Sequence, residues 1–240
     1  MIFYAGYYTQ SVMKKADITH QNIYKGMALI ADPIHQYILF TVPEDKSTKE
    51  KTEQNIIDSA WMQRLRRIYQ LQSARWVYPA AEHSRFQHSL GTMHMAGEFA
   101  KSIYPSLAGV CPDLPSPNYV EELLRLAGLL HDVGHGPYGH FFDDNYLSRW
   151  GLTHEVVGQN IIVEKLGGEI ARIRRSPSGA FARGEVMDAK RVAFLIKMPE
   201  AEEPGKQPRW LEMLRQLFSG VYTVDNLDYV QRDAYMTGFS

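Results

Sequence analysis

Cysteine, net charge and long apolar runs are all scarce in this sequence of 240 residues. The single cysteine, Cys111, excludes an internal disulfide and a zinc site built from thiolates, so any metal ligands must be histidines and carboxylates. The 26 Lys and Arg residues nearly balance the 27 Asp and Glu residues. With a net charge of −1, no overall positive field favours nucleic acid or anionic lipid as a partner, so any polyanion contact must be local.

No run reaches the roughly 18 consecutive apolar residues of a membrane-spanning helix, and the N-terminus lacks the order of a secretion signal. We therefore expect a cytoplasmic, soluble protein without membrane contact. With 45% apolar residues, the chain is long enough for one globular domain over residues 1–240 with a substantial core.

The spacing of apolar residues predicts a mostly helical chain. Apolar runs on both sides of Asp32 and Pro33 predict a small hairpin over residues 28–42. A cap at Ser59 predicts a core-facing helix to Leu71, and a cap at Asn118 predicts another to residue 131. Further helices are predicted over residues 84–104, where prolines end the helix, and over 154–166, 210–218 and 225–235. Residues 167–184 and 199–208 are predicted to be exposed loops.

Histidine is concentrated in one part of the chain. Seven of the nine histidines lie between residues 83 and 154, far more than an even spread would place there. They are His83, His88, His94, His131, His135, His140 and His154. Because thiolates are absent, these imidazoles are the first candidates for a metal site, and their clustering is the feature to explain.

The segment from Ala127 to His140 carries the strongest chemical signal. An apolar helix ends in His131 and Asp132, and the glycines that follow allow the backbone to approach an anion. Imidazole nitrogen and carboxylate oxygen are ligands that iron, manganese and zinc accept. A helix end with His and Asp as plain polar caps is the alternative, and three histidines in ten residues between glycines disfavour it.

Two other segments offer partners for this pair. His88 lies one turn after Arg85 and off the apolar stripe of its helix, and an arginine beside a metal ligand suits phosphate. Asp225, Tyr229 and Arg232 share one face of the last predicted helix. Taken alone, His88 fits a solvated helix position. The spacing of Asp225, Tyr229 and Arg232, taken alone, favours a surface face with salt bridges.

Together, these residues resemble the H…HD…D pattern of the HD-domain metal-dependent phosphohydrolases. Over residues 27–238 the surrounding motifs resemble the dNTP triphosphohydrolase branch, which includes the bacterial dGTP triphosphohydrolases and the human sterile-alpha-motif and HD-domain enzyme. We expect the C-terminal lobe of these relatives to be absent from the chain. The motifs are Asp32-Pro-Ile-His35, Gln63-Arg-Leu-Arg66, Arg85-Phe-Gln-His88-Ser-Leu-Gly91, Ala127-Gly-Leu-Leu-His131-Asp132-Val-Gly-His135-Gly-Pro, His154-Glu155 and Asp225-Asn-Leu-Asp228-Tyr229-Val-Gln-Arg232-Asp233.

The resemblance implies a mostly α HD-domain fold with a small N-terminal β-hairpin. It also implies hydrolysis of dNTPs to deoxynucleoside and tripolyphosphate, by attack of metal-generated hydroxide on the α-phosphate. The implied cofactor is a divalent metal (Fe, Mn, Mg, Zn, Co or Ni), and the implied assembly is a homo-oligomer.

The resemblance also assigns roles to individual residues. The implied metal ligands are His88, His131, Asp132 and Asp225. The implied catalytic residues are His135, His140, Asp143 and His154, with His140 as the preferred proton donor. The implied substrate contacts are Gln70, Leu71, Arg85, Tyr229 and Asp233. Asp58, Gln63 and Arg66 fall where nucleotide-activated relatives bind an activating guanine nucleotide, but these residues also suit a helix start and packing.

Two alternatives stay open at this stage. One is another phosphoesterase on the same scaffold, acting on nucleoside monophosphates, cyclic dinucleotides or single-stranded nucleic acid, with the arginines of residues 172–183 facing the nucleic acid. The other is a nucleotide-sensing subunit with a degenerate site, against which the intact set of four ligands argues. Asn226 stands where several family members have a lysine, so one phosphate contact is missing or is supplied elsewhere.

Overall fold

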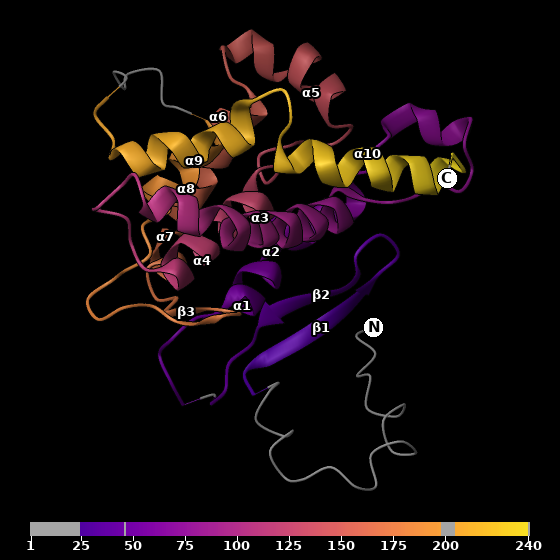
Figure 1. Ribbon diagram of the computed structural model, residues 1–240. Helices are drawn as coiled ribbons and strands as arrows, with labels where there is room; N and C mark the ends of the chain where they lie inside the picture. Colours follow the sequence, from indigo (N-terminus) through magenta and orange to yellow (C-terminus); the bar gives the residue numbers. More distant parts are fainter. Residues whose placement is uncertain (1–24, 46, 198–204, 240) are drawn as a thin grey trace, which may run out of the picture.

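The computed structural model describes residues 25–45, 47–197 and 205–239, and helices dominate this part of the chain (Figure 1). None of the described helices is both long and apolar enough to cross a membrane. The helices are α1 (Glu53–Ile57), α2 (Ala60–Gln63), α3 (Arg85–Ala108), α4 (Pro117–Leu130), α5 (His140–Asn145), α6 (His154–Asn160), α7 (Gly167–Ile170), α8 (Ala189–Ile196), α9 (Arg209–Ser219) and α10 (Val224–Thr237). The strands form two hairpins, β1 (Met27–Asp32) with β2 (Gln36–Thr41) and β3 (Arg175–Ser176) with β4 (Gly179–Ala180). The mostly α prediction is confirmed.

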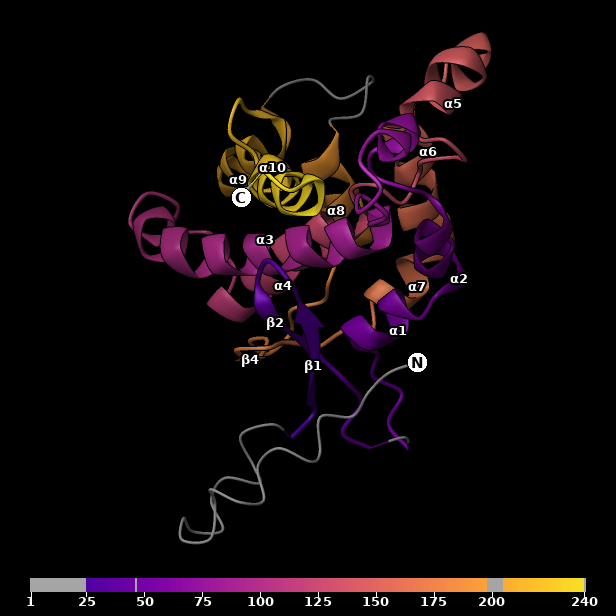
Figure 2. The ribbon, with the colours of Figure 1, turned by 90° about the vertical axis from the view of Figure 1, so that its right-hand side faces the viewer.

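Helices α3 and α4 pack along each other at the centre of the core, and α10 packs across α3 (Figure 2). Every residue of α4 from Tyr119 to Leu130 is buried, because this helix also contacts α8 and the β3 segment. Gly128 allows the close approach of α4 to α3, since a Cβ at this position would lie 2.7 Å from the carbonyl oxygen of Thr92. The end of α4 is thereby fixed beside the first half of α3.

The β1–β2 hairpin is confirmed, with Met27 paired to Thr41 and Asp32 paired to Gln36. Asp32 closes the turn, because its Oδ1 accepts hydrogen bonds from the backbone nitrogens of Ile34 (2.9 Å) and His35 (3.0 Å). The side chain of Ile38 is fully buried in the core. The hairpin is therefore attached to the helices along one face, with its turn ordered by its own aspartate.

The prediction of one helix over residues 59–71 is wrong beyond the first turns. Ser59 caps α2 as expected, because its Oγ accepts from the backbone nitrogen of Met62. A single 3-10 turn follows over Arg64–Arg67, and the backbone is then extended at Ile68. The reason is tertiary: the carbonyl of Ile68 accepts from the backbone nitrogen of Arg85 at 2.9 Å. This segment thereby anchors the start of α3 instead of continuing as a helix.

The boundaries of α3 and α4 also differ from the prediction. Helix α4 begins with Ser116 as its cap, while the side chain of Asn118 donates to the carbonyl oxygen of Ala180 at 2.7 Å. Helix α3 continues through Pro105 to Ala108. A proline in the last turn removes one backbone donor without preventing the turn from closing.

The segment over residues 167–184 is less exposed than predicted. Ile170 and Ile173 are fully buried, and Arg175 donates to Glu44 at 2.6 Å, next to the first hairpin. Helices α5 and α8 were not predicted, because α5 is short and α8 has a single apolar stripe of two turns. Part of the loop predicted over residues 199–208 lies outside the described residues.

Glu122 is an ionisable residue inside the core. It is fully buried in α4, and its carboxyl oxygens have no hydrogen-bond partner within the described chain. Burial raises the pKa of Glu122 well above its usual value, and the neighbouring Glu53 carboxylate adds to this shift. Glu53 is itself paired, with Arg125 Nε 2.6 Å from its Oε1. Glu122 therefore keeps its proton in the folded protein at pH values where the unfolded chain loses it.

We expect Glu122→Gln to stabilise the protein more at pH 8 than at pH 4.5. The pKa of Glu122 is higher in the folded protein than in the unfolded chain. Its stabilising contribution to the free energy of unfolding is therefore present below the pKa of the unfolded chain and is lost as pH rises through the pKa of the folded protein. Glutamine has no such dependence. Urea unfolding at the two pH values measures the difference, with the exposed Glu164→Gln as a control expected to stay within about 0.5 kcal/mol. An equal change at both pH values for Glu122→Gln would contradict this assignment.

Candidate metal centre

A cavity of about 390 Å³ lies where α3, α10 and the loop after α4 meet. Most of the residues that the sequence predicted for a site line this cavity, although they come from distant parts of the chain. They are Gln70, Arg85, His88, His131, Asp132, His135, His140, His154, Asp225, Tyr229 and Asp233.

The remaining predicted residues lie outside the cavity lining. Asp143 lies behind the lining histidines, and Leu71 is not among the lining residues. The residues expected for an activator are elsewhere: Gln63 Oε1 accepts from Arg66 Nε at 2.8 Å, and the Arg66 guanidinium lies 3.7 Å from the ring centre of Phe86. These contacts lie within the protein, and a role of Asp58, Gln63 and Arg66 in activator binding stays a prediction.

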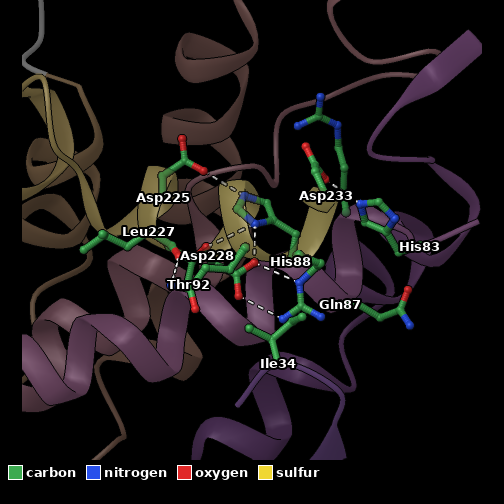
Figure 3. Close-up of polar contacts among 12 residues, drawn as sticks. Ile34, His83, Gln87, His88, Thr92, Asp225, Leu227, Asp228 and Asp233 are labelled. Carbon is green, nitrogen blue, oxygen red and sulfur yellow. Dashed lines mark hydrogen bonds and ion pairs between the residues drawn. The ribbon is translucent and has the colours of Figure 1, made fainter. Parts of the chain in front are cut away.

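His88 and His131 face each other with their Nε2 atoms 3.1 Å apart. A carboxylate and a carbonyl can only accept hydrogen bonds, so the partners of the two Nδ1 atoms fix both tautomers. His88 Nδ1 donates to Asp228 Oδ2 at 2.8 Å (Figure 3), and His131 Nδ1 donates to the carbonyl of Gly128 at 2.8 Å. In the neutral rings, two Nε2 lone pairs therefore point at each other, which is unfavourable unless a cation lies between them.

Two carboxylates complete this group. Asp225 Oδ1 lies 2.8 Å from His88 Nε2 and 3.6 Å from His131 Nε2, and Asp132 Oδ1 lies 3.5 Å from His131 Nε2. Ligand atoms of His88, His131 and Asp132 all lie within 4.8 Å of one another. Imidazole and carboxylate ligands in this number fit a divalent transition metal. These four residues, called the metal group below, can therefore hold a divalent ion.

The surroundings of His88 favour positive charge. Burial by itself lowers the pKa of His88, but hydrogen bonds to Asp225 and Asp228 outweigh burial and raise this pKa to about 10. The pKa of Asp225 is lowered. Burial by itself raises this pKa, but the hydrogen bonds to His131 and His88 outweigh burial. The site thus favours positive charge at its centre.

Three histidines surround Asp143 next to the metal group. The Nδ1 atoms of His154, His135 and His140 lie 2.7, 3.2 and 3.4 Å from Asp143 Oδ2. The rings of His135 and His154 are stacked 3.8 Å apart, and burial lowers the pKa of His135 to about 4. His140 is different, because 59% of its side chain is exposed. This set, called the histidine cluster below, also has ligand atoms close enough to hold an ion.

Arg64 fixes the loop between the metal group and the histidine cluster. Its guanidinium donates to the carbonyl oxygens of His135, at 2.5 Å, and Val133. Arg64 lies in the Gln63-Arg-Leu-Arg66 motif, but the sequence alone does not indicate a role for it. Its contacts show that the helical turn after α2 supports the loop that carries His135.

Asp228 is the most important residue that sequence reasoning missed. It is fully buried, and besides His88 it accepts hydrogen bonds from His35 Nε2 (2.6 Å) and Arg232 Nη2 (2.8 Å). Arg232 in turn donates to Asp32 at 2.8 Å, in the turn of the first hairpin. Burial raises the pKa of Asp228, but these hydrogen bonds lower it more, so the group is a carboxylate. Its i, i+4 spacing to Arg232 was the signal that could have identified it.

The family of this protein follows from a comparison of its sequence with known families. The family model described as "HD domain" matches residues 85–204, half of the chain. The chain belongs to the HD-domain family. The matched range contains His88, His131 and Asp132 of the metal group, and the mostly helical fold agrees with it.

Relatives of this HD-domain chain include proteins with and without a stated activity. An uncharacterised protein of Methanocaldococcus jannaschii is 32% identical over 88% of this chain and 34% of its own length. A deoxynucleoside triphosphate triphosphohydrolase SAMHD1 homolog of Dictyostelium discoideum is 27% identical over 78% of this chain and 34% of its own. The chain thus spans about a third of the length of these relatives.

Solved structures show the same fold. A hypothetical protein from Aquifex aeolicus superimposes with a TM-score of 0.63 at 29% identity, over 89% of this chain and 47% of that one. A phosphohydrolase from Bacteroides thetaiotaomicron VPI-5482 gives a TM-score of 0.60 at 28% identity, over 89% of this chain and 43% of that one. The HD-domain chain therefore shares its fold with a phosphohydrolase.

We expect Asp228→Asn to weaken divalent metal binding by about 10- to 100-fold. An amide has one acceptor oxygen, so it cannot serve His88, His35 and Arg232 together, and the orientation of His88 is lost. Titration of Mn²⁺ in a calorimeter measures the affinity. Asp233→Asn is the matched control, since it removes the same charge from the same helix without touching the metal group. Unchanged Mn²⁺ affinity in Asp228→Asn would contradict the role given to this residue.

Proposed function

We propose that this HD-domain chain is a metal-dependent phosphohydrolase that cleaves deoxynucleoside triphosphates to deoxynucleoside and tripolyphosphate. The observation that carries the proposal is that one cavity is lined by the metal group, by Arg85 and by the three histidines of the histidine cluster. The relative named a deoxynucleoside triphosphate triphosphohydrolase homolog supports the choice of substrate.

The metal group and Arg85 form the phosphate end of the cavity. A divalent metal held there would lower the pKa of coordinated water and polarise a phosphoryl oxygen. Arg85 Nη1 donates to Asp132 Oδ2 at 2.6 Å, while the buried Nε of Arg85 has no acceptor among the described residues. A phosphoryl oxygen would satisfy this donor, and the guanidinium would stabilise negative charge that develops on the phosphate.

His140 is the proposed general acid. Departure of the 5′-oxygen requires a proton, and His135 has none to give at neutral pH because burial lowers its pKa to about 4. His140 lines the cavity, and its Nδ1 lies 3.4 Å from Asp143 Oδ2. Asp143 and His154 then act by orienting His140.

The other end of the cavity would hold the nucleoside. Its volume of about 390 Å³ lies in the range of roughly 300–1,000 Å³ for small-molecule pockets. Phe218 and Tyr229 offer aromatic surface, and Gln70 and Asp233 offer hydrogen bonds. Asn226, which stands where several family members have a lysine, donates to the carbonyl of Val221 at 3.2 Å at the start of α10 instead of lining the cavity. Arg85 therefore carries more of the proposed phosphate contact.

Three of the four arginines in residues 172–183 do not favour a nucleic-acid substrate. Arg172 donates to the carbonyl of Lys49 at 2.6 Å, Arg174 to that of Ala171 at 2.7 Å, and Arg175 pairs with Glu44. These side chains are engaged within the protein. Activation by a nucleotide, a homo-oligomeric state and a cytoplasmic location stay predictions.

Product analysis tests the proposed reaction directly. Metal-loaded protein incubated with each dNTP should yield deoxynucleoside and tripolyphosphate on ion-exchange chromatography. Attack at the α-phosphorus with the 5′-oxygen as the leaving group breaks the bond to the sugar and keeps the three phosphates joined. Protein treated with a chelator should yield neither product. Monophosphate with pyrophosphate, or no product with any divalent metal, would contradict the proposed reaction.

Two variants separate metal binding from proton transfer. Asp132→Ala should lose both Mn²⁺ binding in calorimetry and dNTP turnover, because a ligand is removed. His140→Ala should bind Mn²⁺ normally and lose roughly 10²- to 10⁴-fold in kcat, the usual contribution of a general acid. Full activity of His140→Ala would exclude this histidine as the acid.

A further inference from the structure

Three histidines of the histidine cluster converge on one carboxylate oxygen without hydrogen-bonding it. The Nδ1 atoms of His154, His135 and His140 all lie within 3.4 Å of Asp143 Oδ2. These distances are short enough for hydrogen bonds, yet neither carboxyl oxygen of Asp143 has a hydrogen-bond partner among the described residues. The three rings therefore present nitrogen atoms to the carboxylate without directing an N–H at it.

Burial makes this arrangement costly in the absence of a ligand. His135 is 1% exposed and Asp143 is 8% exposed. His135 Nδ1 is also buried without a hydrogen-bond partner in the described chain, as are both oxygens of Asp143. Buried polar atoms are normally paired, so three unpaired atoms in one place indicate a missing partner. A cation that binds both the nitrogen lone pairs and the carboxylate would satisfy all three.

The distances within the cluster fit a tetrahedral ion. Zinc bonds to nitrogen and oxygen of about 2.0–2.2 Å place neighbouring ligand atoms of a tetrahedron roughly 3.3–3.5 Å apart. Asp143 Oδ2 lies 3.2 Å from His135 Nδ1 and 3.4 Å from His140 Nδ1. The distance of 2.7 Å to His154 Nδ1 is shorter by roughly 0.6 Å, which a small side-chain movement supplies. Ligand atoms of all four residues lie within 4.8 Å of one another.

The fold holds two of the four ligands in place. The ring of His154, the first residue of α6, stacks on the ring of His135 at 3.8 Å. Gly134 allows this approach, because a Cβ there would collide with the carbonyl oxygen of His154. Arg64 holds the carbonyl of His135 from the other side. His140 and Asp143 follow on one side of α5, three residues apart.

The ligand types of the cluster favour zinc over manganese. Three imidazole nitrogens and one carboxylate form a set richer in nitrogen than the metal group, which has two of each. Imidazole suits Zn²⁺, whereas carboxylate oxygen suits Mn²⁺, and sites with nitrogen ligands generally bind Zn²⁺ more tightly. The two groups are neighbours with separate ligands. The Nδ1 atom of His135 faces Asp143, while its Nε2 lies 3.3 Å from Asp132 Oδ1 of the metal group.

We propose that the histidine cluster is a second metal site, which binds Zn²⁺ through His135, His140, Asp143 and His154, and that zinc bound there inhibits the enzyme. The inhibitory effect rests on the proposed function, whereas zinc binding does not. With four protein ligands the zinc is fully coordinated, so it has no open position at which to activate water.

Inhibition follows from the proton balance at His140. As the general acid, His140 is an imidazolium with a proton on each nitrogen, and it becomes a neutral imidazole when it transfers one proton to the 5′-oxygen. Zinc on Nδ1 takes the place of one of these protons. Transfer of the remaining Nε2 proton would leave an imidazolate anion, so the zinc-bound ring is a poor proton donor.

Titration of metal-free protein with Zn²⁺ in a calorimeter counts the sites. Wild type should bind two zinc ions. Asp225→Ala, which removes a ligand of the metal group without touching the cluster, should bind one, and Asp143→Asn should also bind one, because an amide is a poor zinc ligand. The double variant should bind none at these sites. Asp144→Asn, the same change at the neighbouring exposed residue, should bind two like wild type.

Other counts overturn the zinc site. If Asp143→Asn still binds two ions, or if wild type binds a single ion that is lost in Asp225→Ala, the cluster holds no zinc. If Asp143→Asn does not fold, His154→Phe takes its place, since phenylalanine keeps a ring against His135 and has no ligand atom. It should bind one ion, and two ions would again overturn the site.

Turnover of dNTPs by Mn²⁺-loaded protein tests the inhibition. Zn²⁺ should lower kcat of wild type and of Asp144→Asn by roughly 10²- to 10⁴-fold, the contribution of a general acid. Excess Mn²⁺ should not restore this rate, and the residual rate of Asp143→Asn should not respond to Zn²⁺. Full recovery with excess Mn²⁺ would place the effect of zinc at the metal group and overturn the inhibitory role.

The two measurements separate this proposal from the proposed reaction. If no dNTP is hydrolysed but the zinc counts change as expected in Asp225→Ala and Asp143→Asn, the proposed reaction fails and the zinc site stands. If wild type hydrolyses dNTPs and binds only the zinc ion that Asp225→Ala removes, the reaction stands and the zinc site fails.

Discussion

The buried carboxylate of Asp228 is the interaction on which the candidate site depends. It joins three parts of the chain that lie far apart in sequence: His35 in the first hairpin, His88 in α3 and Arg232 in α10. Burying a charge is costly unless it is paired, and here the donors from all three elements satisfy both oxygens. The same carboxylate fixes the tautomer of His88. Helix packing and metal-site geometry are thus determined by one group.

The close packing around this carboxylate explains the polar inner face of α10. Gly91 of α3 lies against it, and a side chain at that position would collide with Asp228. The buried positions of α10 include Asp228 and Arg232, so this helix is held largely by hydrogen bonds and ion pairs. A chain of nearly zero net charge thereby concentrates opposite charges in one place, and the resulting field is local to the cavity.

The sequence predicted the residues of the candidate metal site better than it predicted the bounds of the helices. The residue types of the metal group and their order along the chain pointed to a metal site, and the structure brings these residues together. The helix expected after Ser59 failed because the backbone of Ile68 holds the start of α3, a tertiary contact that no local period encodes. Asp228 was missed for a similar reason, because its role depends on hydrogen-bond partners that are distant in sequence. Periodicity reports which face is apolar, and it cannot report which buried polar groups meet.

The central claim is that His88, His131, Asp132 and Asp225 hold a divalent ion. Anomalous diffraction from crystals grown with Mn²⁺ tests this claim most directly, because it locates the ion without reference to activity. We predict an anomalous peak between the Nε2 atoms of His88 and His131, beside the two carboxylates. A peak within the histidine cluster around Asp143 with none at the metal group, or no peak at either group, would contradict the account.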